Sequence, residues 1–209
     1  MFTLYARENS GSVAVEALLA ELGAEFRLES VQRLEDGSAP APYLLINPRG
    51  EVPALRLLDD SVMTESAAIM IYLADLHPEA GMAPSVDSQD RPKYLRWMLY
   101  FASSVYMADL RYFHSERYST DATHAPFIKA RAHEHMNRDF KIFADELGVG
   151  PFILGENFSA VDIYVAMLIS WAPDLGHLFA RHPNLKTYYK AVAARPLIAA
   201  IWKRNEMPE

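Results

Sequence analysis

Glu65 and Ser66 are the residues of this chain whose types and position point most directly to a bound ligand. They stand at the predicted start of a helix, whose first amide groups and partial positive charge favour a carboxylate. Ser66 can add a hydroxyl donor, and Glu65 can hold a ligand ammonium by a charge-assisted hydrogen bond. In the competing interpretation, Thr64 or Glu65 only caps its own helix.

The chain contains no cysteine among its 209 residues. This excludes disulfides, zinc thiolate sites, iron–sulfur clusters and every mechanism in which the protein supplies a nucleophilic thiol. The sequence also predicts no metal site. His133 and His135 are two positions apart in a predicted helix and point about 200° apart, so both imidazoles cannot face one ion.

The composition is that of an ordinary globular protein, with 51% hydrophobic and 22% charged residues. The net charge of −7 disfavours binding to nucleic acid by bulk charge. The first thirty residues contain a polar stretch at 7–12 and no unbroken apolar run, so we expect neither a signal peptide nor a membrane span. A cytoplasmic location is therefore expected.

The first half of the chain predicts a small sheet with helices. Strand-like residues at 2–5 are followed by a helix from Ser12 to the turn at Gly23, and residues 25–31 alternate as a half-buried strand does. Residues 43–46 predict a short helix. Two further strands, at 54–58 and 61–63, form a predicted hairpin before the helix that opens at Thr64 or Glu65. The expected first domain covers residues 1–77.

The second half predicts helices only. Residues 78–88 contain two prolines and a glycine with little periodicity, which indicates a linker, and residues 89–209 form the expected helical domain. Ser159 and Asp162 have the spacing of a capping box that starts a helix. The apolar stripes are Tyr94, Trp97, Met98 and Phe101; Phe140, Phe143, Ala144 and Leu147; and Ile163, Val165, Ala166 and Ile169.

Three motifs in this order resemble the cytosolic glutathione transferase superfamily, in its bacterial, non-cysteine form. They are VPAL at 52–55, TESAAI at 64–69 and GENFSAVD at 155–162, and the resemblance extends over nearly the whole chain. It implies an α/β plus all-α protein, with an N-terminal thioredoxin-like domain followed by a C-terminal helical bundle. It also implies a homodimer that uses glutathione as co-substrate, with no metal cofactor, no nucleic acid and no membrane partner.

The resemblance gives Val52, Pro53, Glu65 and Ser66 the task of binding the tripeptide. In a thioredoxin-like fold, a cis bond before Pro53 would turn the Val52 backbone outward, where the cysteinyl unit of glutathione can pair with it as an added strand. A trans proline at a strand start is the alternative. The γ-glutamyl carboxylate would lie at Glu65 and Ser66.

The glycyl carboxylate is met in this family by a basic or amide side chain after the second strand. The candidates here are Arg33 and Gln32, with Arg49 as another.

The resemblance places the thiol-activating group between the first strand and the first helix. A thiol with a pKa of about 8.5 needs about 2.7 kcal/mol of thiolate stabilisation to lower that pKa by about two units, which one hydrogen bond to the anion and a helix N-terminus supply. Ser10 is the first candidate, Ser12 the second and Tyr5 the third, and Asn9 stays open. The serines can instead serve as N-caps.

The family's hydrophobic-substrate pocket is lined by the first helices of the second domain. The implied lining residues are Tyr100, Phe101, Ser104, Tyr106, Met107, Tyr112 and Phe113. In the alternative interpretation, most of these aromatic residues fill the core or a dimer interface.

The reaction implied by the resemblance is attack of the glutathione thiolate on a hydrophobic electrophile, as in detoxification. Two other functions stay open. One is a non-catalytic interaction or regulatory protein that keeps the fold, and the other is a carrier of apolar ligands. Glutathione binding separates the first alternative from the enzyme, and turnover of an aryl halide or hydroperoxide separates the second.

Overall fold

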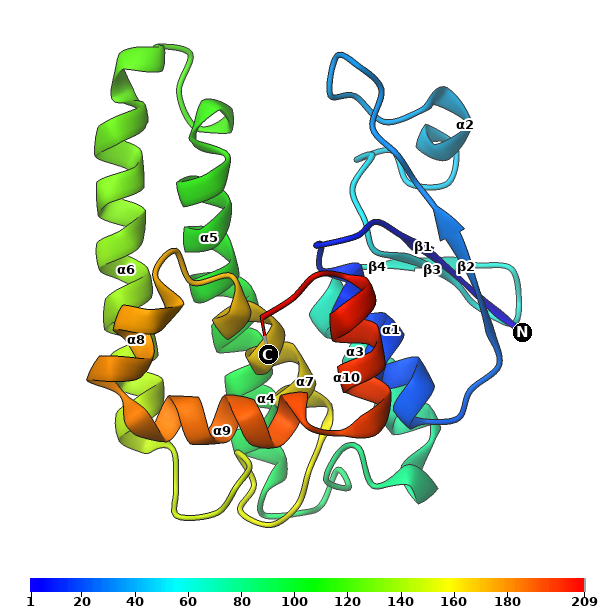
Figure 1. Cartoon of the computed structure of the whole chain (residues 1–209). Helices are drawn as coiled ribbons and strands as arrows, with labels where there is room; N and C mark the ends of the chain where they lie inside the picture. The colour runs from blue at the N-terminus through cyan, green and yellow to red at the C-terminus, as the bar shows by residue number, and fades with distance from the viewer. Residues whose placement is uncertain (209) are drawn as a thin grey trace. The chain divides into compact units, whose positions relative to one another are not determined.

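The computed structural model describes residues 1–208 and divides into two compact units (Figure 1). Unit 1 contains Met1–Ser85 together with the chain from Ala193 onward, and unit 2 contains Val86–Val192. The expected α/β plus all-α class is confirmed. The domain limits differ from expectation at the end of the chain, because the last helix packs with the first unit rather than the second.

The sheet of unit 1 has four strands in the order β2-β1-β3-β4. Strands β1 (Phe2–Ala6) and β2 (Phe26–Ser30) are parallel, whereas β3 (Ala54–Arg56) and β4 (Val62–Thr64) form the predicted antiparallel hairpin. The parallel pair is connected through helix α1 (Ser12–Glu21), as a βαβ unit requires.

Helices cover both faces of this sheet (Figure 1). Helices α1 and α3 (Ser66–Leu76) pack against each other on one face, where Leu4 and Leu55 are fully buried. The short helix α2 (Ala41–Leu44) lies on the other face, and Tyr43 packs there in a cluster with Ala54 and Tyr5. The 3₁₀ segment η1 (Pro78–Ala80) follows α3.

Helix α10 (Pro196–Arg204) packs on α1 and so belongs to unit 1. Its apolar stripe is buried, with Ile198, Ile201 and Trp202 inside the unit. The helix period of these residues is visible in the sequence, but not the surface that they cover.

The regular secondary structure of unit 2 is helical in its described residues, apart from two isolated β-bridges in the turn around Gly155. Its elements are α4 (Arg91–Tyr100), η2 (Phe101–Val105), α5 (Tyr106–Phe113), η3 (Ser115–Arg117), η4 (Ala122–His124), α6 (Ala125–Glu146), α7 (Ala160–Ser170), α8 (Leu175–Arg181) and α9 (Pro183–Ala193). Segment η2 is a π-helix, a rare insertion that occurs frequently at functional sites.

Aromatic rings fill the core of unit 2. The ring centroid of Phe143 lies 4.9 Å from that of Trp97, 5.0 Å from that of Phe101 and 5.5 Å from that of Tyr188, each in edge-to-face geometry. Helix α7 is buried along its whole length. The predicted capping box at its start is confirmed, since the Asp162 carboxylate accepts hydrogen bonds from Ser159 N and Ser159 Oγ, both at 2.9 Å.

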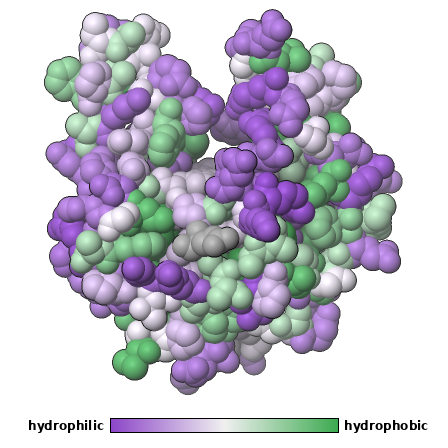
Figure 2. All heavy atoms as spheres, viewed as in Figure 1, coloured by the Kyte–Doolittle hydropathy of each residue, from purple (hydrophilic) through white to green (hydrophobic). Residues whose placement is uncertain are grey.

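Hydrophilic residues predominate on the face shown in Figure 2, and hydrophobic residues occur there in scattered groups. Among residues 1–208, no single helix is both long and apolar enough to cross a membrane. Helices α7 and α8 meet those criteria only as a pair, which is bent by 117°.

Candidate functional site

Ser10 and Ser12 share one acceptor at the junction of β1 and α1. Ser10 Oγ lies 2.7 Å and Ser12 Oγ 3.0 Å from the carbonyl oxygen of Arg7, and the two hydroxyl oxygens are 2.8 Å apart. The amide of Arg7 donates to Ser12 Oγ at 3.1 Å. Either serine can therefore satisfy the Arg7 carbonyl while the other donates elsewhere.

The two serines differ in exposure. Ser12 is 1% exposed, and its oxygen ties the end of β1 to the start of α1, so the structure favours a structural role for this residue. The N-cap of α1 is Gly11, without a side-chain hydrogen bond, so the alternative prediction of a serine N-cap is wrong. Ser10 is half-buried. The Ser10 hydroxyl and the amide groups that follow it lie at the N-terminal end of α1, where the helix dipole stabilises an anion.

Tyr5 lies on β1, with its hydroxyl turned to a cation. Tyr5 Oη accepts from Arg56 Nη2 at 3.2 Å, and its ring centroid is 5.6 Å from that of Tyr43. This contact uses only the acceptor side of the hydroxyl, so Tyr5, like Ser10, keeps a proton that it can donate to a thiolate.

The bond between Val52 and Pro53 is cis, as predicted. The register between β1 and β3 runs from the pair Tyr5 and Ala54 to the pair Thr3 and Arg56, and it does not include Val52. Val52 thus stands beyond the end of the ladder.

Two side chains that the sequence analysis did not identify stabilise the turn before Val52. Tyr43 Oη and Asn47 Nδ2 both donate to the carbonyl oxygen of Glu51, at 2.6 and 2.7 Å, immediately before Val52. Both side chains are buried, and burial raises the pKa of Tyr43. The Asn47-Pro48 pair is a sequence signal for a turn with side-chain hydrogen bonds and could have indicated this role.

Glu65 and Ser66 lie at the start of α3, as predicted. Ser66 is the first residue of the helix and is buried, whereas Glu65 is exposed and has a left-handed backbone with φ of 67°. A non-glycine residue in this region is strained, and such residues occur preferentially at ligand sites. The Glu65 carboxylate also contributes to raising the pKa of Arg49, after the larger effect of the hydrogen bond to Glu51.

The basic candidates lie on exposed loops. Arg33 Nη1 donates to the carbonyl oxygen of Gly37 at 2.6 Å, and Gln32 Nε2 donates to Ser30 Oγ at 2.7 Å. Arg49 pairs with Glu51 at 3.0 Å. These contacts do not single out any of the three for the glycyl carboxylate.

The expected pocket residues of unit 2 fall into two groups. Tyr100 and Phe101 face the core, because Tyr100 Oη donates to the buried Asp139 at 3.0 Å and Phe101 is fully buried. Burial and the Asp139 carboxylate raise the pKa of Tyr100 to about 12. Phe101 was expected to line the pocket and is instead a core residue.

The second group is partly exposed and begins in the π-helical segment. Ser104 lies in η2, Tyr106 opens α5 with its ring centroid 5.6 Å from that of Trp171, and the Tyr112 ring centroid lies 5.0 Å from that of Phe113. Their role as pocket residues stays a prediction.

Comparisons with known proteins identify the family of this chain. Residues 12–76 match the model of the glutathione S-transferase N-terminal domain, and residues 126–191 match that of the C-terminal domain. A sphingomonad glutathione S-transferase, solved in complex with glutathione, is 30% identical with a TM-score of 0.82, and 98% of each chain is covered. The chain belongs to the glutathione transferase family.

Two further members of the family resemble this chain over nearly the whole length. A glutathione transferase homologue from Sulfitobacter, solved with bound glutathione, is 29% identical with a TM-score of 0.87 and 98% coverage of both chains. The glutathione S-transferase GstA of Escherichia coli O157:H7 is 29% identical over 197 residues, which are 92% of this chain and 93% of the relative.

Proposed function

We propose that this protein binds glutathione in unit 1 and activates its thiol for attack on a hydrophobic electrophile. The observation that supports the proposal is that Ser10 and Ser12 can replace each other as hydrogen-bond donor to the carbonyl oxygen of Arg7. When Ser12 donates to this carbonyl, the hydroxyl of Ser10 is released to donate to a sulfur without leaving a backbone acceptor unsatisfied.

The released hydroxyl lies where a thiolate gains most. A hydrogen bond to a charged acceptor contributes about 1.5–3 kcal/mol, and the amide groups at the start of α1 add the favourable field of the helix. Together, these two interactions supply the thiolate stabilisation of about 2.7 kcal/mol that is required to lower a thiol pKa by about two units. The proton leaves to solvent, the thiolate forms a carbon–sulfur bond with the electrophile, and the leaving group departs.

The rest of the tripeptide has partners of matching chemistry. The cysteinyl unit pairs with the backbone of Val52, which stands outside the sheet ladder. The γ-glutamyl carboxylate meets the start of α3 at Ser66, and its ammonium meets the exposed carboxylate of Glu65. Arg33 is the proposed partner of the glycyl carboxylate.

Calorimetry and a conjugation assay test this function. We expect the protein to bind glutathione and to turn over a generic aryl halide. Binding without turnover of an aryl halide or a hydroperoxide would support a ligand carrier, and the absence of glutathione binding would support a non-catalytic interaction protein. Either result would overturn the enzymatic proposal.

We also propose that the chain forms a homodimer, which rests on the family assignment. Light scattering during size-exclusion chromatography measures the mass in solution. A single-chain mass would contradict this part of the proposal.

A further inference from the structure

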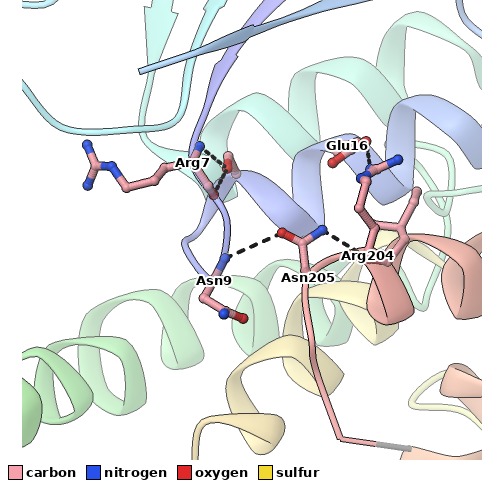
Figure 3. Close-up of polar contacts among 7 residues, drawn as sticks. Arg7, Asn9, Glu16, Arg204 and Asn205 are labelled. Atoms are coloured by element: carbon pink, nitrogen blue, oxygen red, sulfur yellow. Dashed lines mark hydrogen bonds and ion pairs between the residues drawn. The ribbon is translucent and has the colours of Figure 1, made fainter. Parts of the chain in front are cut away.

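The end of helix α10 reaches the loop that carries the serine pair (Figure 3). Asn205, which caps α10 and is 4% exposed, accepts a hydrogen bond from the amide of Asn9 through Oδ1 at 3.4 Å. Its Nδ2 donates to the carbonyl oxygen of Ile201 at 3.0 Å. The two partners fix which side-chain atom faces the loop, because one is a donor and the other an acceptor.

Asn9 is a backbone position that needs such a contact. Asn9 directly precedes Ser10 and is exposed. Its backbone has a left-handed conformation, with φ of 50°. Asn tolerates this conformation better than most residues, but the conformation still has a free-energy cost. Since the Asn9 side chain points away from Asn205, the contact acts on the backbone alone.

Helix α10 is itself fixed to α1 near both of its ends. Arg195 forms a two-pronged ion pair with Glu21, at 2.6 and 3.2 Å, and Arg204 pairs with Glu16. Glu21 and Glu16 are almost fully buried. Asn205 therefore approaches the loop from an anchored helix.

We propose that Asn205 is a positioning residue for the thiol-activating loop and acts through the amide of Asn9. The inference rests on the proposed function. Holding the Asn9 backbone fixes the direction of the Ser10 hydroxyl, so loss of the contact weakens the hydrogen bond to the thiolate. Glutathione binding through Val52, Glu65 and Ser66 does not depend on this contact.

The test compares three variants. Asn205→Leu removes the acceptor and Asn205→Asp keeps it, while Arg195→Gln removes an ion pair of the same helix far from the loop. The readouts are the pKa of the bound glutathione thiol, and kcat and KM for glutathione. We expect Asn205→Leu to raise that thiol pKa and lower kcat roughly two- to tenfold at neutral pH, with little change in KM.

The other two variants separate positioning from general stability. Asn205→Asp keeps the acceptor but adds a negative charge, so it serves as control only in the exchange measurement below. Arg195→Gln should lower the Tm without changing the pKa of the bound thiol. The inference is overturned if Asn205→Leu keeps the wild-type thiol pKa and kcat. It is also overturned if Arg195→Gln changes the thiol pKa and kcat as much as Asn205→Leu does. Should Asn205→Leu not fold, Asn205→Ala carries the same comparison.

Hydrogen exchange of the Asn9 amide gives a readout that needs no glutathione. The amide should exchange slowly in the wild type and Asn205→Asp, and faster in the variants without the acceptor. Equal exchange in all of them contradicts the inference. Absence of glutathione binding in the wild type contradicts the proposed function instead, while the exchange rates still decide whether Asn205 orders the loop.

Discussion

Ser10 Oγ and Ser12 Oγ lie 2.8 Å apart, and the carbonyl oxygen of Arg7 is within hydrogen-bond distance of both. Two donors thus compete for one backbone acceptor. This arrangement lets one hydroxyl act on a ligand while the other maintains the loop, and it divides the two serines into a proposed catalytic residue and a structural one.

Ser10→Ala tests the catalytic residue. The variant should raise the pKa that governs the pH profile of kcat/KM for the electrophile, at saturating glutathione, by about one to two units, because it removes a hydrogen bond of about 1.5–3 kcal/mol to the thiolate. Ser10→Thr keeps a hydroxyl and should stay near the wild type. Tyr5→Phe should change the profile little, and a larger shift in Tyr5→Phe than in Ser10→Ala would exchange their roles.

Ser12→Ala tests the structural residue. It leaves the amide of Arg7 without its acceptor, so the free energy of unfolding should fall by about 1–3 kcal/mol in urea denaturation. Ser88→Ala is a matched control, since Ser88 Oγ accepts from the amide of Asp90 on an exposed turn. Its loss should stay below about 0.5 kcal/mol. Equal losses in the two variants would contradict the structural role of the buried Ser12 hydroxyl.

Glu65→Gln tests recognition of the γ-glutamyl ammonium. Removing a charge-assisted hydrogen bond should raise the Kd for glutathione about tenfold or more, as measured by calorimetry. An analogue that lacks this ammonium should bind the wild type and Glu65→Gln with equal affinity. If Glu65→Gln weakens the analogue as much as glutathione, the carboxylate does not act on the ammonium.

Protonation of Asp109 should make the stability of the protein depend on pH. This residue of α5 is 7% exposed, and Oδ1 has no hydrogen-bond partner among the described residues, so burial raises its carboxyl pKa from 3.8 to about 7. The folded state therefore holds the proton more tightly than the unfolded state. This residue's contribution favours folding least above pH 7, and stability falls as pH rises from about 4 to about 7.

The expected size of this effect is large. A difference of about three pKa units corresponds to about 4 kcal/mol. Asp109→Asn should remove the decrease in urea denaturation between pH 4.5 and 8, and Asp109→Leu should do the same. A wild-type curve parallel to that of Asp109→Asn would show that Asp109 does not hold a proton in the folded state.

Asp162 predicts which helix cap stabilises the protein most. Its buried carboxylate accepts from Ser159 N, Ser159 Oγ and Ile153 N, so Asp162→Ala should lower the free energy of unfolding by about 3–5 kcal/mol. Asp174→Ala removes an exposed cap of α8 and should cost only about 1 kcal/mol. Denaturant unfolding measures both, and similar losses would contradict the role of burial.

Local patterns predicted much of the fold. The spacing of Val15, Leu18 and Leu22 predicts α1, and the alternation at 25–31 predicts β2, because both depend on neighbours along the chain. The positions of Glu65 and Ser66 at the start of α3 followed in the same way.

Contacts between distant residues could not be predicted. Asn9 and Asn205 are 196 positions apart, and nothing in the period of α10 indicates that its capping residue reaches the first loop. The two side-chain hydrogen bonds to the carbonyl oxygen of Glu51 could not be predicted for a related reason. Tyr43 has the pattern of a helix residue, and only the folded chain shows its hydroxyl beside the carbonyl of Glu51.

We propose that unit 1 stabilises bound glutathione as a thiolate. Ultraviolet difference absorption of the glutathione complex, titrated from pH 5 to 9, measures the thiol pKa directly. We expect a thiolate signal at neutral pH, with a pKa about two units below the value of about 8.5 for a free thiol. A complex that shows no thiolate signal until the pH nears 8.5 would contradict it.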